Sequence, residues 1–167
     1  MYAYEKAVLK TYKQTESFIK TTKNSIVKGA YSSFRSFRPA KEQAEKLIGL
    51  IERKSEIEEL KNAIDQTLAS LKPCHAYLIG ERYGVGEYAN VEPIPRNNAY
   101  YRKSAYALGK FVQGMRERGF TNEVYNLLCK NYGYIDHAYK NIVALEQRIL
   151  QSGNLHHTGK SLKPNAK

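Results

Sequence analysis

Cysteine, tryptophan and long apolar runs are scarce or absent in this sequence. Its 167 residues include two cysteines and no tryptophan. No apolar run approaches the roughly 18 residues that a membrane-spanning helix needs, and the N-terminal stretch "MYAYEKAVLK" lacks the apolar centre of a secretion signal. We therefore expect a cytoplasmic protein with no membrane partner, in which Cys74 and Cys129 are reduced thiols rather than a disulfide.

Acidic residues are also few relative to basic ones. Lysine and arginine number 27 against 16 aspartates and glutamates, which gives a formal net charge of +11. The excess is concentrated in residues 1–38, with eight basic and two acidic side chains, and in residues 73–118, with seven and four. Such a chain attracts polyanions, of which nucleic acid is the commonest, although an acidic protein surface or an anionic membrane would also serve.

Strand patterns are missing, whereas helical spacing recurs along most of the chain. Apolar residues three, four or seven positions apart form stripes, and prolines, glycines and capping residues separate them. The sequence therefore predicts an all-α fold, a helical bundle of about six helices with one or two helix-turn-helix-like hairpins. The predicted helices cover residues 3–28, 41–71, 74–83, 98–118, 122–130 and 135–151.

We expect these helices to form one domain with three parts. Residues 1–38 form a basic N-terminal helix and a connection, residues 39–152 the helical core, and residues 153–167 a flexible basic tail. Gly153 fits the position just after the end of the last helix. Phe34 and Phe37, within the turn-rich connection, are expected to dock onto the core.

Residues 125–144, "YNLLCKNYGYIDHAYKNIVA", carry the spacing of a helix-turn-helix unit. Cys129 is the small residue that such a unit needs in its first helix, and Gly133 stands where the turn becomes left-handed. The second helix would then present Asp136, His137, Lys140 and Asn141 outward, where they could approach bases or phosphates. The alternative is an ordinary helical hairpin, in which Gly133 is a plain C-cap. The expected apolar contacts of the unit come from Leu128, Tyr132, Tyr134, Tyr139 and Ile142.

A second pattern covers about residues 55–112. It includes the phrases "AIDQTLASLKPCHAYLIGERY" and "IPRNNAYYRKSAYALGKF". These phrases resemble the region 4 module of bacterial sigma factors and the related phage late-transcription regulators of the ArpU type. The interval from Tyr83 to Tyr100 is a few residues shorter than in that family and contains Pro93 and Pro95, which leaves open a rebuilt module. The resemblance implies that the later helix reads DNA through Arg96, Asn97, Asn98, Tyr100, Arg102 and Lys103.

Basic residues alternate with aromatic ones in "YSSFRSFRP" and "YYRKSAY". Arg35, Arg38 and Lys110 suit phosphate contact beside stacked bases. The alternative is a solvated basic face whose aromatic residues point inward. Within the buried stripe of the later helix, we expect Tyr101 to face the core.

Catalytic and metal-binding patterns are not found. The four histidines and two cysteines have no paired ligand spacing, and "GNLHHTGKS" lacks the spacing and the preceding strand of a phosphate loop. We therefore expect no metal, no cofactor and no enzymatic activity. The predicted function is a DNA-binding regulator of a phage or mobile element, with duplex DNA as the partner. The alternative is a small basic protein that binds a protein or ribonucleoprotein, as an inhibitor of a nucleic-acid enzyme or as an assembly subunit.

Overall fold

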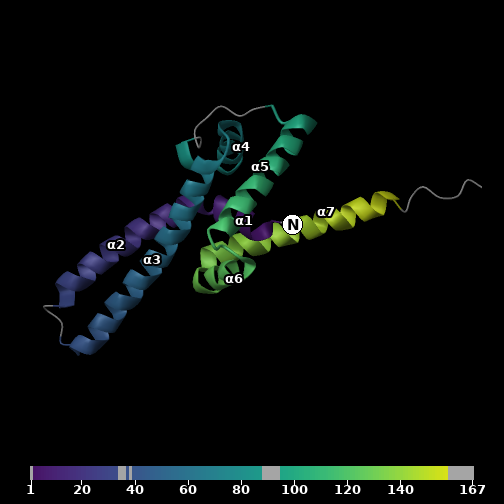
Figure 1. The fold of residues 1–167 in the computed structure, drawn as a ribbon. Helices are drawn as coiled ribbons and strands as arrows, with labels where there is room; N and C mark the ends of the chain where they lie inside the picture. The colour runs from purple at the N-terminus through teal and green to yellow at the C-terminus, as the bar shows by residue number, and fades with distance from the viewer. Residues whose placement is uncertain (1, 34–36, 38, 88–94, 158–167) are drawn as a thin grey trace, which may run out of the picture.

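The computed structural model describes residues 2–33, 37, 39–87 and 95–157, and within these ranges the fold is all-α, as predicted. Seven helices form instead of about six, because the first predicted helix is divided in two (Figure 1). The helices are α1 (Ala3–Lys10), α2 (Tyr12–Ser33), α3 (Ala40–Ser70), α4 (Pro73–Tyr83), α5 (Asn98–Glu117), α6 (Asn122–Asn131) and α7 (Gly133–His157).

The helix break at Thr11 directs α1 and α2 to different neighbours. The Thr11 hydroxyl donates a hydrogen bond to the carbonyl oxygen of Ala7 at 2.9 Å, and the Thr15 hydroxyl donates one to that of Thr11 at 3.1 Å. Threonine side chains that bond back to the preceding turn bend helices. As a result α1 packs on α7, whereas α2 packs along α3. The buried side chains of Val8 and Leu9 make α1 part of the core.

The core lies where α1, α6 and the first half of α7 meet α5 and the second half of α3. From this centre the antiparallel α2–α3 pair extends to one side as an arm, and the second half of α7 extends to the other (Figure 1). In the arm the helices approach closely, since a Cβ added to Gly29 would lie 2.8 Å from Leu47 Cδ2. The largest fully buried side chains include Leu9, Ile57, Leu60, Ile64, Phe111, Met115, Tyr125, Leu128 and Ile135.

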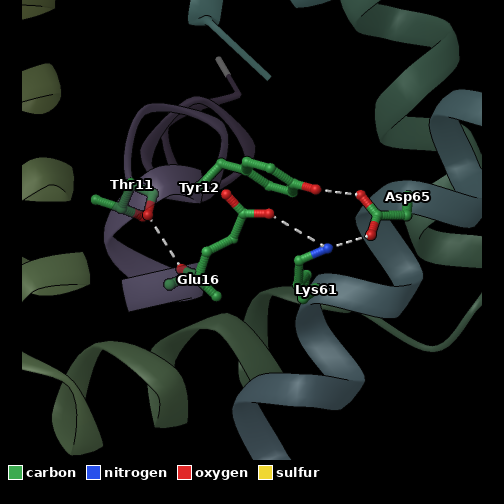
Figure 2. Close-up of polar contacts among 6 residues, drawn as sticks. Thr11, Tyr12, Glu16, Lys61 and Asp65 are labelled. Atoms are coloured by element: carbon green, nitrogen blue, oxygen red, sulfur yellow. Dashed lines mark hydrogen bonds and ion pairs between the residues drawn. The ribbon is translucent and has the colours of Figure 1, made fainter. Parts of the chain in front are cut away.

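A polar cluster ties the base of the arm to the core (Figure 2). The Tyr12 hydroxyl donates a hydrogen bond to Asp65 Oδ1 at 2.6 Å, and Lys61 Nζ donates one to Asp65 Oδ2 at 2.7 Å. Lys61 Nζ also lies 3.6 Å from Glu16 Oε1 and 5.1 Å from the centre of the Tyr12 ring. These contacts join the start of α2 to the second half of α3, so the arm leaves the core at a defined position.

Several predictions about where helices end and which residues face the core are wrong. Gly153 lies inside α7, which continues to His157, and Phe37 is fully exposed rather than docked; Phe34 is outside the described residues. In α5 the core position is Tyr100, 4% exposed, and its neighbour Tyr101 is 49% exposed. The predicted stripe is confirmed from Leu108 onward and is one residue out of step only in the first turns of α5, because two adjacent tyrosines give no local signal of which one faces inward.

Buried tyrosines make the fold sensitive to alkali. A side-chain hydrogen bond with Tyr139, followed by burial, raises the pKa of Tyr4 to about 12, and burial raises the pKa of Tyr125 and Tyr132. Tyrosines of the unfolded chain lose their protons near pH 10, so unfolding above that pH releases protons and its free energy falls as the pH rises. Below about pH 10 the full stability is present.

We therefore expect the urea midpoint to be constant from pH 8 to about pH 10 and to fall steeply towards pH 12. Denaturation by urea, followed by circular dichroism at each pH, measures the effect, and Tyr4→Phe should make the decline shallower. A midpoint unchanged through pH 12 would contradict the prediction.

Candidate nucleic-acid interface

Helices α4 and α5 lie side by side and run antiparallel. The Tyr100 hydroxyl donates a hydrogen bond to Glu81 near the end of α4, while the rings of His75 and Tyr106 are 5.3 Å apart near its start. Local signals set the ends of both helices. Pro73 begins α4, and Asn97 Oδ1 caps α5 by accepting a hydrogen bond from the Tyr100 backbone N–H at 2.9 Å.

Four of the exposed cations on this helix pair line hollows between the two helices, and we call them the α4–α5 face: Lys72, Arg102, Lys103 and Lys110. Arg102 and Lys110 stand two helical turns apart on α5, with Tyr106 between them. Lys110 Nζ lies 5.8 Å from the centre of the Tyr106 ring. None of the four forms an ion pair with any residue that the structure describes. Their charges are therefore available to an external anion.

A hollow groove lies between the two helices at this face. It consists of two adjoining hollows of about 530 Å³ and 370 Å³. Both are lined by Cys74, Leu78, Ala99 and Lys103, and Arg102 stands at the larger one. We call this the α4–α5 groove. Its floor is apolar and its rim is cationic.

Three other predicted residues at the start of α5 have local roles. Arg96 Nη2 lies 3.7 Å from Glu81 Oε1, so a buried carboxylate already balances part of its charge. Asn97 uses its side-chain oxygen as the helix cap, and Asn98 is exposed in the first turn. The prediction for Tyr100 is corrected, because its ring is buried and its hydroxyl is bonded to Glu81, so it cannot stack on a base.

The α6–α7 hairpin forms at the predicted place, but without the predicted turn. Cys129, Tyr132 and Ile142 are buried, as the apolar offsets require. The turn, however, is a single extended residue, Tyr132 at φ −128°, and Gly133 is the first residue of α7 rather than a left-handed glycine. The pair is an ordinary helical hairpin, but Gly133 is not its C-cap either, because Tyr132 takes that position.

The outward residues of α7 are largely engaged with one another. Lys140 Nζ lies 2.6 Å from Asp136 Oδ2, and this contact raises the pKa of Lys140. Asn141 Nδ2 is 3.3 Å from His137 Nδ1. The cation is thus balanced within its own helix, in contrast to those of the α4–α5 face.

Alanine substitutions at two glycines test the description of the turns. Gly119, which ends the α5 region at φ +87°, and Gly133 both have open space around an added Cβ, so only the backbone conformation distinguishes them. Gly119→Ala should destabilise the fold by about 1 to 2 kcal/mol, because L-residues are strained there. Gly133→Ala should be neutral or stabilise it by up to about 1 kcal/mol. Urea denaturation measures the stability of both variants. A large loss of stability in Gly133→Ala would instead support the predicted left-handed turn.

Arg35 and Arg38 fall outside the described residues, as do Pro93 and most of the interval in which the sigma-like module departs from its family. The sites predicted there remain predictions.

No family model, curated protein or solved structure matches this chain. The resemblance to sigma region 4 and ArpU-type regulators accordingly stays a prediction. Within the described ranges, no helix is both long and apolar enough to cross a bilayer. In the same part of the chain, no three histidine, cysteine or acidic side chains gather as metal ligands would.

The structure adds Lys72, Cys74, His75 and Tyr106 to the residues that the sequence singled out. The spacing of Arg102, Tyr106 and Lys110, four residues apart, could have indicated a shared helix face. Nothing in the sequence indicated that Lys72 and His75 lie opposite that face, because this depends on how α4 folds back along α5.

Proposed function

We propose that this chain is a non-enzymatic DNA-binding protein and that the α4–α5 face is its phosphate-contacting surface. Four exposed cations that lie together at the hollows of α4 and α5, each with no ion pair in the described chain, carry this proposal, since cations that neutralise DNA phosphates release the counterions condensed there. The resemblance of residues 55–112 to sigma region 4 supports the same helix, α5, as the reader. On that resemblance we propose transcription regulation in a phage or mobile element.

The α7 helix is the weaker candidate for the interface. Lys140, its predicted phosphate contact, is already paired with Asp136 at 2.6 Å. Binding a phosphate there would bring the anion close to a carboxylate, which offsets the attraction.

A gel-shift titration with duplex DNA at 50 mM salt tests the proposal. We expect binding at micromolar protein, and four phosphate contacts predict a loss of affinity of about a hundredfold between 50 and 200 mM salt. Absence of a shift at tens of micromolar protein would refute the proposed function.

A protein or ribonucleoprotein partner is the second candidate, and the arm is the observation that favours it. Large apolar side chains are exposed on it, among them Tyr31, Phe37 and Ile51, and a protein partner could bury them. Retention of a partner after nuclease treatment, and its loss from a Tyr31→Ser/Ile51→Ser variant, would support this alternative.

A further inference from the structure

The α4–α5 groove has a feature that contact with a duplex backbone does not use. Its floor, formed by Cys74, Leu78 and Ala99, is apolar and hollow, and Arg102 and Lys103 stand at its rim. The backbone of a duplex presents phosphates and sugars, while its bases remain stacked inside. It would therefore meet the cations and leave the floor unfilled.

Aromatic rings complete the groove on the side of Tyr106. Tyr106 is 59% exposed, the His75 ring meets it edge-on, and Lys110 Nζ lies near its centre. Cations along a backbone track, together with exposed rings and apolar surface for bases, are the combination that binds single-stranded nucleic acid.

We infer that the α4–α5 groove takes an unpaired base of a nucleic-acid strand, with the flanking phosphates on Arg102, Lys103 and Lys110. The inference rests on the proposed function, and it specifies which form of DNA this face binds best. Single-stranded or locally unpaired DNA binds this face more tightly than a fully paired duplex does.

The distance over which the cations are spread favours a nucleic-acid strand over a small anionic ligand or an acidic peptide helix. From Arg102 to Lys110 the face extends about 12 Å along α5. A small ligand with one anionic group would use only one end of it. An acidic amphipathic helix needs a line of apolar anchors, whereas the apolar side chains that line both hollows form one small cluster, Leu78 and Ala99 beside Cys74.

Cys74 provides a direct reporter of occupancy. It is exposed in the groove floor, whereas Cys129, the other cysteine, is buried with its pKa raised by burial to about 11. The rate of maleimide modification of the folded protein therefore reports on Cys74. We expect a thymidine dodecamer to slow this reaction about tenfold or more at saturation. An abasic strand of equal length and charge should slow it less than twofold although it binds.

Ala99→Leu is the matched variant, since it fills the floor without changing charge and Ala99 is exposed rather than in the core. It should weaken binding of the thymidine dodecamer about tenfold and change duplex binding less than twofold, with an unchanged thermal melt. Arg102→Ala should weaken both. Fluorescence anisotropy with each labelled DNA measures these affinities.

Three results would overturn the inference. The first is equal protection of Cys74 by the thymidine and abasic strands, and the second is unchanged single-strand binding by Ala99→Leu. The third is stronger protection by a helical glutamate–leucine peptide than by the thymidine dodecamer, which would assign the groove to a protein partner. If duplex binding persists in these cases, the proposed function stands. If neither DNA binds, the proposed function fails as well.

Discussion

Replacing Arg102 and Lys103 together with glutamate is expected to weaken duplex DNA binding about a hundredfold at 50 mM salt. Two phosphate contacts are lost, which lowers the slope of log affinity against log salt by about 2, and the new carboxylates repel the backbone. Both side chains are exposed and neither has an ion pair in the described chain, so the fold should be unaffected. Gel shifts at several salt concentrations, with a thermal melt of each variant, measure the effect.

Lys20→Glu/Lys23→Glu is the matched control. Both lysines are exposed on α2, and the double substitution changes the net charge by the same amount. If the α4–α5 face is the interface, this control should lose less than about threefold in affinity, through the long-range field alone. Equal losses in the two double variants would show that total charge, rather than this face, attracts DNA.

Gly114→Val is expected to destabilise the fold by about 3 kcal/mol, at the upper end of the cost of overpacking. A Cβ at this position would lie 2.7 Å from Thr67 Cγ2, where α5 crosses α3. Thr67 cannot simply rotate, because its hydroxyl donates a hydrogen bond to the Ala63 carbonyl oxygen at 2.6 Å in a buried site. The helices must therefore separate, and the core that they share loosens.

A double-mutant cycle isolates this contact. Thr67→Ser removes the methyl group and keeps the hydroxyl, so it should relieve most of the cost of Gly114→Ala, with a coupling energy of about 1 to 2 kcal/mol. Gly49→Ala is the control, since Gly49 lies within α3 with open space around an added Cβ, and it should stabilise by about 0.5 to 1 kcal/mol. Urea denaturation measures all four variants. Additive effects at Gly114 and Thr67 would refute the close contact.

The helices were predictable because local residues set most of their ends. Pro73 begins α4, and Asn97 caps α5. Gly84, at φ +68°, stops α4. These signals act within one or two turns of the chain and need no distant partner. The break at Thr11 was missed because threonine also fits a helix interior, and the bend matters only when α7 and α3 are there to receive the two halves.

The candidate interface was predicted only in part. Arg102, Lys103 and Lys110 follow from the sequence, whereas the opposing Lys72 and His75 do not. Tyr100 was predicted to contact nucleic acid and is instead bonded to Glu81, 19 residues earlier in the chain. A shift of the buried stripe by one position along the helix decides whether a ring lies in the core or in solvent. Packing against α4 sets that position.

The sequence by itself determined an all-α chain with an excess of positive charge, because helix propensity, capping and net charge are properties of residues and their near neighbours. Only the tertiary structure decided which cations keep an unbalanced charge. Arg96 lies 3.7 Å from Glu81 across the α4–α5 contact, while Arg102 has no carboxylate within ion-pair distance in the described chain. Charge balance depends on distances of a few ångströms, and folding sets those distances.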